Sequence, residues 1–377
     1  MFAERYANSI GYLLTHAGPV IRYRLKRDIL HSLTESEAMQ LQQEIAQLPY
    51  YQIVQRYVKP NGYIGSGMHS WDNWRGERLH ETPLQDGERA ARLLSYYCVP
   101  KDAPIVADFV AAMRNENVLR EEFSYIPPEI PRFENRFVGL NNGNSLMAMM
   151  YAMQAMLGYG DDYADLREFQ QICLRGFDHL RTAESFESIT KYDASAKRRY
   201  NYRYIESDEY FPDVFTLAML AYTRSWRSEE NVDMLAKALN HINEIMKPEY
   251  NMHVRIAGKF YAPCFAMIHP IRAFDPSLID SINYRRPLTE IAMLGVGEQV
   301  EVIRRSADAV RAALDSDGIL RMDFSVPHNK RYSPKKIEYT GSYGDVRLEA
   351  DYKSKHGLLC DLTFWAIEFL YLVEGDE

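Results

Sequence analysis

Two aspartates near the starts of predicted helices are the first candidates for chemistry. Asp213 precedes the uncharged run VFTLAMLAY, and Asp361 lies in LLCDLTFWAIEFLYLV. A carboxyl group that faces an apolar cavity has a raised pKa because desolvation disfavours its charged form, so either residue can act as a general acid. Each can equally cap its helix, since an aspartate in the first turn accepts backbone N–H groups. The sequence therefore leaves acid catalysis and helix capping open for both.

Two further polar residues stand in similar positions. Asp86 lies in the helix expected at 84–98, and His356 precedes the last expected helix. Either can serve as an acid, a base or a binding group, or can cap its helix. No histidine pair has the spacing HExxH, which argues against zinc. The candidate catalytic residues are Asp213, Asp361, Asp86 and His356.

Aromatic and basic residues gather in two loops. The cluster WDNWR at 71–75 sets tryptophans beside polar groups, as in sites for sugars or aromatic ligands. The loop KYDASAKRRYNYRY at 191–204 is basic in an acidic chain, so it favours an anionic ligand. Loops that pack on the fold, or are merely solvated, have the same composition. The expected substrate-binding residues are Trp71, Trp74, Asn142, Asn144, Lys197, Arg198, Arg199, Tyr202, Arg203, Tyr210 and Trp365.

The last helix offers a further grouping. By helical spacing Asp361, Trp365 and Glu368 share a face, so an acid, a ring and a second acid can be presented together.

The segment DDYAD holds the pattern DDxxD, with Asp161, Asp162 and Asp165 on one turn. Three carboxylates so arranged can hold magnesium and a diphosphate. The segment lies in a short turn before a helix, where aspartates serve as N-caps. We therefore expect no cofactor, with magnesium as the weaker alternative.

The elements that would position these groups are helices in alternating inner and outer roles. The segment 141–157 is apolar on all sides and is expected to be buried, whereas 162–180 has one apolar stripe and is expected on the surface. Three N-terminal helices and a closing helix at 358–373, packed against the first, complete the prediction. The other expected pairs are 84–98 with 103–113, 211–226 with 229–246, and a less regular pair, 264–274 with 289–314, while the N-terminal helices are expected at 3–14, 20–31 and 35–48.

The connections between these helices are unequal. Turns from an inner to an outer helix are short, whereas connections from an outer helix to the next inner one are long, as at 114–140, 181–209, 247–263 and 315–357. In a ring of helix pairs the long loops and the N-termini of the inner helices share one rim. Such a rim favours an anionic group, because helix N-termini carry unpaired N–H groups and positive partial charge.

Length and composition limit the remaining possibilities. The chain has 377 residues and a formal net charge of -8, which argues against a nucleic-acid partner. Its four cysteines form no CxxC pair, and the N-terminus has no apolar h-region, so we expect a cytoplasmic protein without a membrane span. We expect one domain over 1–377, in which residues 1–80 pack on the helical hairpins of 81–377; the oligomeric state is left open.

Five segments resemble the α/α-toroid proteins related to squalene cyclases, terpenoid cyclases and protein prenyltransferases, in their small bacterial form. GPVIRYRLKRDIL resembles their opening helix, and the loops KPNGYIGSG and DSDGILRMDF resemble their Asp-Gly-aromatic repeat. NNGNSLMAMM and YFPDVFTLAMLAY are similar to inner helices, and LLCDLTFWAIEFLYLV looks like the closing helix. The resemblance implies an all-α toroid of about six helical hairpins, with inner and outer rings around an apolar, aromatic-lined cavity.

The resemblance brings no catalytic signature with it. The cyclase motif DxDD is absent, and Cys360-Asp361 has the reverse order of the zinc-binding Asp-x-Cys pair of prenyltransferases. Our first hypothesis is a terpenoid-cyclase or prenyltransferase-like enzyme that acts by acid-initiated chemistry on an isoprenoid-type substrate with an anionic head group. The alternatives are a carbohydrate-active hydrolase or epimerase on a similar helical ring and a non-catalytic toroid that binds a ligand, since fold alone cannot choose among them.

Overall fold

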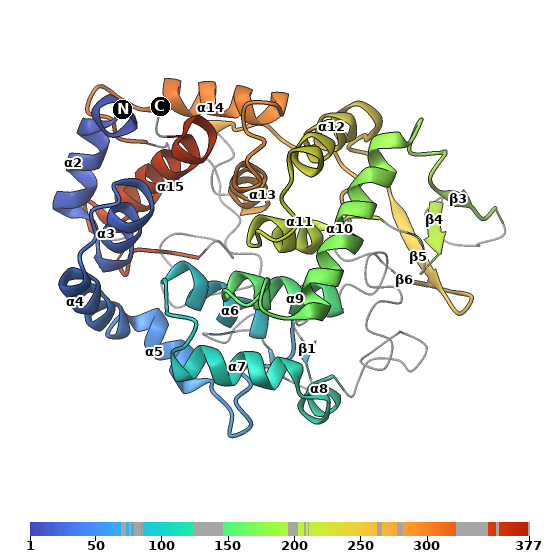
Figure 1. The fold of residues 1–377 in the computed structure, drawn as a ribbon, viewed down its shortest axis with the longest axis horizontal. Coiled ribbons are helices and arrows are strands. Elements are labelled where there is room, and N and C mark those ends of the chain that lie inside the picture. The colour runs from blue at the N-terminus through green and yellow to red at the C-terminus, as the bar shows by residue number, and fades with distance from the viewer. Residues whose placement is uncertain are drawn as a thin grey trace. The chain divides into compact units, whose positions relative to one another are not determined.

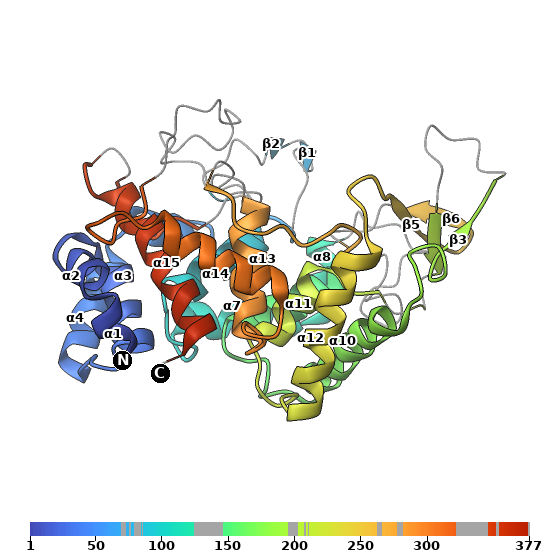
Figure 2. The same cartoon turned by 90° about the horizontal axis from the view of Figure 1, so that it is seen from above.

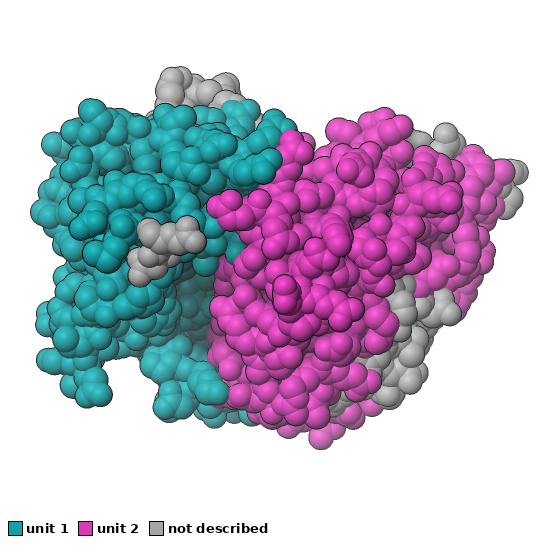
Figure 3. Space-filling model, turned by 45° about the horizontal axis from the view of Figure 1, so that its top comes forward, with its two compact units in different colours: residues 1–114, 273–292, 303–377 teal, residues 115–272, 293–302 magenta. Residues whose placement is uncertain are grey.

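Helices dominate the computed structural model of this chain (Figure 1). The structure describes residues 1–68, 73–74, 77–78, 84, 86–123, 146–194, 203–206, 209, 211–261, 266–276, 282–321, 346–351 and 354–375. The chain divides into two compact units, which are coloured separately in Figure 3. Unit 1 comprises 1–114, 273–292 and 303–377, and unit 2 comprises 115–272 and 293–302.

Unit 2 is built from two consecutive helical hairpins, as the inner and outer pattern predicts. The inner helices α9 (Leu146–Met156) and α11 (Val214–Ala221) lie side by side, and so do the outer helices α10 (Ala164–Thr182) and α12 (Glu229–Ile245) (Figures 1 and 2). The described side chains of α9 are buried all round, whereas α10 buries one stripe. The short helix α8 (Glu116–Glu122) precedes them.

The tight turn between α9 and α10 is specified by local sequence. Helix α9 ends in a Schellman motif, in which Tyr159 N–H donates to the Gln154 carbonyl at 3.0 Å and Gly158 N–H to the Ala155 carbonyl at 2.9 Å. Gly158 has φ 89°, a left-handed conformation that glycine adopts at little cost. The chain therefore reverses at once into α10.

Unit 2 also contains strands, so the expectation of a wholly helical chain is wrong. The strands β3 (Lys191–Tyr192), β4 (Arg203–Glu206), β5 (Met252–Ile256) and β6 (Lys259–Tyr261) form one sheet in that order, with β4 and β5 parallel. Alternate residues of β5 are buried, which is the period of a half-buried strand. Ala257 and Gly258 join β5 to β6 with φ 49° and 79°, the signs that a type I′ hairpin turn requires.

Unit 1 contains the N-terminal and C-terminal helices. Its elements are α1 (Phe2–Arg5), α2 (Ala7–His16), α3 (Pro19–Arg24), the π-helix η1 (Leu25–Ile29), α4 (Glu35–Ala46), α5 (Pro49–Arg56), the short strands β1 (Asn73–Trp74) and β2 (Glu77–Arg78), α6 (Gly87–Tyr96), α7 (Pro104–Arg114), α13 (Ile282–Met293), α14 (Glu301–Ala313) and α15 (Gly357–Glu374). The last residue of α13 and the first two of α14 belong to unit 2.

The last helix closes on the first helices, as predicted. Helix α15 packs against α2, α3 and η1 (Figures 1 and 2). Near its end, Glu374 accepts hydrogen bonds from Arg5 at 2.6 Å and from Tyr6 at 2.8 Å. These bonds fix the two chain ends of unit 1 to each other.

The predicted fourth pair is wrong in its boundaries. Residues 266–275 form no helix, because Pro270 lacks an N–H and also disfavours a helical His269 before it. Helix α13 instead begins at Ile282 and continues through Pro287, which the sequence suggested as a break. The helix persists because Leu288 and Ile291 are buried on the following turn.

The two Gly-containing loops of the proposed repeat have the same geometry. Val58 pairs with Ile64 across Asn61-Gly62, and Leu314 pairs with Leu320 across Asp317-Gly318. Gly62 has φ 82° and Gly318 has φ 73°. Each turn follows a helix, α5 or α14, and closes a single bridge, so the two loops are similar local structures within unit 1.

Candidate functional site

Asp213 is a helix cap. It precedes α11, where its Oδ1 accepts hydrogen bonds from the N–H groups of Phe215 at 2.9 Å and Thr216 at 2.8 Å. The Thr216 hydroxyl in turn lies 2.9 Å from the N–H of Asp213, which completes a capping box. Capping thus accounts for a buried carboxylate at this position.

We expect Asp213→Ala to lower the free energy of unfolding by about 1 to 2 kcal/mol, because two N–H groups of α11 lose their acceptor. Asp213→Asn, which keeps an acceptor oxygen, should lose only a few tenths of a kcal/mol. Urea denaturation of both variants measures the difference. Equal losses in the two variants would contradict the capping role.

Asp86 and Asp361 differ in their roles. Asp86 caps α6 by accepting the N–H of Arg89 at 3.0 Å and is fully buried. Asp361 is the fifth residue of α15, so it is past the first turn and does not cap the helix. It is buried beside Tyr50, Tyr97 and Glu349, whose pKa values it helps to raise.

His356 lies at the start of α15 and contacts α2. Its Nδ1 and the Tyr12 hydroxyl are 2.9 Å apart, and its ring stacks on His16 with centroids 4.1 Å apart. Desolvation, His16 and Lys355 lower the pKa of His356. The contacts of His356 with Tyr12 and His16 join the start of α15 to α2.

Trp365 and Glu368, which the helical spacing places on one face, have partners on different helices. Trp365 Nε1 donates to the Thr289 hydroxyl of α13 at 3.1 Å, and its ring lies near Phe274 and Phe369. Glu368 instead forms an ion pair with Arg24 of α3. The two side chains, three residues apart, turn to different helices.

Most predicted binding residues lie outside the described part of the chain. Arg203 lies in β4, where its Nη1 contacts the Thr190 hydroxyl at 3.0 Å, and Trp74 lies in β1. Those outside the described residues are Trp71, Asn142, Asn144, Lys197, Arg198, Arg199, Tyr202 and Tyr210.

The DDxxD segment has a structural role at Asp161. Its carboxylate accepts hydrogen bonds from Arg224 N–H at 2.8 Å, Ser225 N–H at 3.0 Å and the Gln170 side chain at 3.0 Å. These bonds tie the turn before α10 to the turn before α12. Asp165 accepts from the Tyr151 hydroxyl at 3.2 Å, so at least two of the three carboxylates have protein partners. Among the described residues, no three His, Cys, Asp or Glu side chains are grouped to hold a metal ion.

The structure shows a set of buried charged side chains, of which the sequence analysis selected only Asp361. They lie on α6, α13 and α15 in unit 1, and five of the six are under 5% exposed, while the sixth, Arg286, has 11% of its side chain exposed. We call this set the interior charge cluster: Glu88, Arg89, Arg92, Arg286, Glu290 and Asp361.

Arg286 holds the centre of this cluster. Its Nε lies 2.7 Å from Glu290 Oε1, and its Nη1 lies 3.3 Å from Glu88 Oε1. Arg92 Nη1 approaches the same Glu88 oxygen at 4.0 Å. The two carboxylates and two guanidinium groups thus form a row of alternating charge, in which Arg286 and Glu290 come from α13 and Glu88 and Arg92 from α6.

Burial and the neighbouring charges shift the pKa values of Glu290 and Arg286. It raises the pKa of Glu290, because desolvation outweighs the opposing effects of Arg286 and Arg92. Burial also acts to lower the pKa of Arg286, but the carboxylates of Glu290 and Glu88 outweigh it, so this pKa is raised. Arg286 remains a cation, and Glu290 takes up a proton more readily than an exposed glutamate.

Two tyrosines connect the cluster to residues 346–351. Tyr97 donates to the Arg347 carbonyl at 3.0 Å, and the Tyr50 hydroxyl bonds the Arg347 side chain. Burial raises the pKa of both tyrosines, while Arg89 acts to lower it. Arg89 and Asp361 are thus two charged groups that act on both tyrosines.

Sequence signals for the cluster were present but weak. An inner helix containing GERAAR carries three charges, which is unusual for a buried element. Pro287 lies between Arg286 and Glu290 and suggests a helix boundary, so the sequence does not indicate that the two residues share one helix. A buried helix with paired charges is the pattern that would have identified this site.

Comparison with known protein families, curated proteins and solved structures finds no match to this chain. Among the described residues, no helix combines the length and apolar character needed to cross a bilayer. The functional argument therefore depends on the geometry of the interior charge cluster.

Proposed function

We propose that this protein is an acid–base enzyme for a small polar anionic substrate of the acidic-sugar class, with Glu290 as the proton-transferring group. Arg286 orients Glu290, Glu88 pairs with Arg286, and Arg92 lies beside Glu88. This places the chemistry among the carbohydrate-active alternatives.

The proposal is carried by the second oxygen of Glu290. The residue is 1% exposed and its Oε1 is held by Arg286, yet Oε2 has no hydrogen-bond partner in the described part of the chain. A buried carboxylate oxygen without a partner costs free energy and calls for an explanation. A carboxyl group anchored by one oxygen with the other available is the arrangement that general acid–base catalysis needs.

The density of buried charge supports a polar substrate over an isoprenoid body. Taking an ion out of water costs several kcal/mol even after relaxation, and replacing buried pairs by apolar residues is often neutral or stabilising. Glu88, Arg92, Arg286 and Glu290 are thus costly as purely structural residues. Guanidinium groups bind carboxylates in a planar fork, which suits a substrate that carries a carboxylate.

The ring fold forms part of the proposal. The successive hairpins within unit 2, the closure of α15 on α2 within unit 1, and the two similar Gly turns support the α/α toroid implied by the resemblance. Fold alone selects no chemistry.

Cyclase-type chemistry is the second candidate, and one aromatic group favours it. Trp365 lies one helical turn after Asp361, with Phe274 at 5.4 Å, Phe369 at 5.6 Å and the Arg285 guanidinium at 5.9 Å from its ring. Aromatic faces stabilise cations, so such a group suits a carbocation intermediate.

A thermal-shift screen separates the two candidates. Uronic acids, matching neutral sugars and prenyl diphosphates are added to the full chain, since a ligand of the folded state raises its melting temperature. We expect stabilisation by the uronic acids and not by their neutral counterparts. Stabilisation by prenyl diphosphates alone, or by no compound, would overturn the first candidate.

Turnover of a stabilising compound tests the role of Glu290. We expect Glu290→Gln to bind that compound as the wild type does but to convert it about a hundredfold more slowly, because a general acid–base group is lost. The exposed Glu168→Gln variant on α10 is the matched control and should keep full turnover. Full turnover in Glu290→Gln would refute the assignment, and slow turnover in both variants would also count against it.

A further inference from the structure

The interior charge cluster extends outward through one aromatic ring. The guanidinium carbon of Arg92 lies 5.8 Å from the centroid of Tyr96, and that of Arg24 lies 5.6 Å from the same centroid. The ring of Tyr96 thus lies beside two guanidinium groups, the inner cation Arg92 and the outer cation Arg24.

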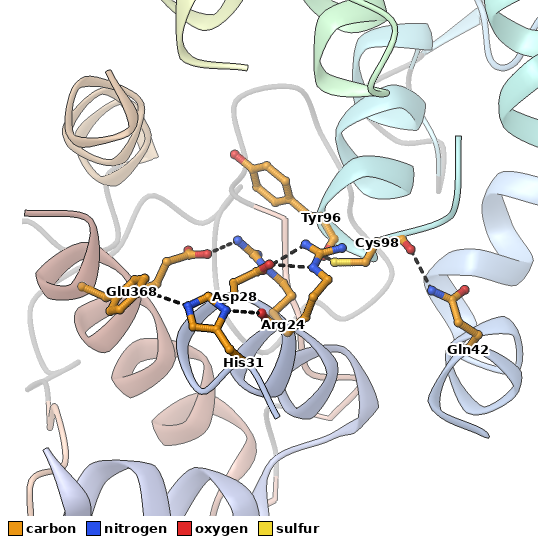
Figure 4. Close-up of polar contacts among 9 residues, drawn as sticks. Arg24, Asp28, His31, Gln42, Tyr96, Cys98 and Glu368 are labelled. Carbon is orange, nitrogen blue, oxygen red and sulfur yellow. Dashed lines mark hydrogen bonds and ion pairs between the residues drawn. The ribbon is translucent and has the colours of Figure 1, made fainter. Parts of the chain in front are cut away.

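The outer cation is itself fixed. Arg24 forms an ion pair with Glu368 of α15 (Figure 4). Its guanidinium carbon lies 5.0 Å from the centroid of the Phe364 ring. Both side chains of the ion pair are about 15% exposed, which limits screening by solvent. Arg24 therefore lies against Tyr96 in a defined place.

The backbone around Tyr96 is fixed as well. Tyr96 is the last residue of α6, and the helix ends in a Schellman motif in which Val99 N–H donates to the Leu94 carbonyl at 3.0 Å. Cys98 takes the left-handed position of this motif with φ 54°, where glycine is usual. Gln42 of α4 donates to the Cys98 carbonyl at 2.8 Å, as Figure 4 shows. The end of α6, and with it the Tyr96 ring, is held from two sides.

We infer that Tyr96 is a positioning residue of the Glu290 site. Its ring holds the Arg92 guanidinium against Glu88, and through Arg92 and Arg286 it keeps cations beside Glu290. The inference rests on the proposed function for its purpose, but the electrostatic link between Tyr96 and Glu290 is a property of the folded chain alone.

The test measures this link without a substrate. Unfolding free energies of each Tyr96 variant and of the same variant with Glu290→Gln are compared from pH 4 to 9. If the pKa of a glutamate is raised on folding, the protein loses stability relative to its glutamine variant as the pH rises, and the loss becomes constant above the pKa in the folded state. We call the pH at which the loss becomes constant the levelling pH. It follows the pKa of Glu290 in the folded chain.

Three replacements of Tyr96 are expected to raise, keep or lower the levelling pH. Tyr96→Met removes the ring, so Arg92 loosens and the levelling pH should rise by about one unit, a tenfold change in proton affinity. Tyr96→Phe keeps the ring and should stay within about 0.3 units of the wild type. Tyr96→Trp supplies a stronger cation-binding face and should move the levelling pH downward.

Each result decides for or against the inference. A shift in Tyr96→Met that Tyr96→Phe does not share supports positioning, whereas lower stability with an unchanged levelling pH shows a merely structural ring and overturns it. If Tyr96→Met does not fold, the Trp and Phe variants decide, since equal values in these two contradict the role of the ring. A failed ligand screen would leave this titration unaffected, so the two proposals fail separately.

Discussion

Gly160→Ala is expected to lower the free energy of unfolding by about 3 kcal/mol, because overpacking a filled core forces neighbouring groups apart. A Cβ at Gly160 would lie 2.3 Å from the Thr223 methyl group and 2.9 Å from Ala155 Cβ. Thr223 cannot turn away, since it is fully buried and its hydroxyl donates to the Met219 carbonyl at 2.7 Å. The added carbon must therefore separate α9 from the end of α11.

Gly11→Ala is the matched control for this substitution. Gly11 lies inside α2, and a Cβ there would meet no atom within 4 Å. Alanine should stabilise this helix by about 0.5 to 1 kcal/mol, because glycine loses more backbone freedom on folding. Chemical denaturation of both variants measures the contrast. A loss below about 1 kcal/mol in Gly160→Ala would show that the turn relaxes and would contradict the predicted close packing.

The hairpins of unit 2 could be predicted because the relevant signals are local. The uncharged run at 146–156 and the striped run at 164–182 differ in where their apolar residues fall, and Gly158 marks the stop between them. Burial on all sides and burial on one face follow directly from these patterns. The Gly160 contact itself is not in the pattern, since it depends on Thr223 from the next hairpin.

The sheet could have been predicted in part. Met252 to Ile256 alternates in burial, and Ala257-Gly258 supplies a two-residue turn, which together indicate a hairpin. The parallel pairing of β4 with β5 is a different matter, because it joins residues about fifty positions apart in sequence and no local signal specifies it. All four strands lie in the segments 181–209 and 247–263, which the sequence analysis predicts as long connections.

The candidate site was the least predictable part. Asp213 and Asp86 were selected for their positions at helix starts, and those positions are what make them caps. Glu290 follows the apparent helix break at Pro287, and charge on a helix ordinarily indicates a solvated face, so its sequence context does not single it out. Only packing brings it against Arg286 and excludes solvent, and packing between helices distant in sequence is invisible to periodicity.

The second large effect is expected at Glu349, whose side chain bonds the start of α3. Its Oε1 accepts the N–H of Gly18, the N-cap residue of α3, at 2.7 Å. In a capping box this N–H is satisfied by a side chain of the first turn of the helix. A Cβ on Gly18 would lie 2.8 Å from Glu349 Oε2, so the glycine leaves room for the carboxyl group. Burial raises the pKa of Glu349 to about 7, with Asp361 adding to the rise and the Gly18 N–H opposing it.

The sign of the pH dependence follows from this raised pKa. The unfolded chain releases the Glu349 proton near its usual value of 4.5, whereas the folded chain keeps it until about pH 7. The wild type therefore loses stability relative to Glu349→Gln as the pH rises from about 4.5 to 7, and the difference stays constant above that range. At about 1.4 kcal/mol per pKa unit, the upper limit of the loss is about 3.5 kcal/mol.

Unfolding of the wild type and of Glu349→Gln from pH 4 to 9 measures this difference. Glutamine keeps an acceptor for the Gly18 N–H but has no charge, so the variant should become the more stable protein above pH 7. The exposed Glu168→Gln variant controls for a change in net charge and should show no such window. If the two proteins have parallel stability curves across this range, Glu349 ionises as freely in the folded chain as in water. The carboxyl group would then be solvated rather than buried against α3, and its hydrogen bond with the Gly18 N–H would be exposed to solvent.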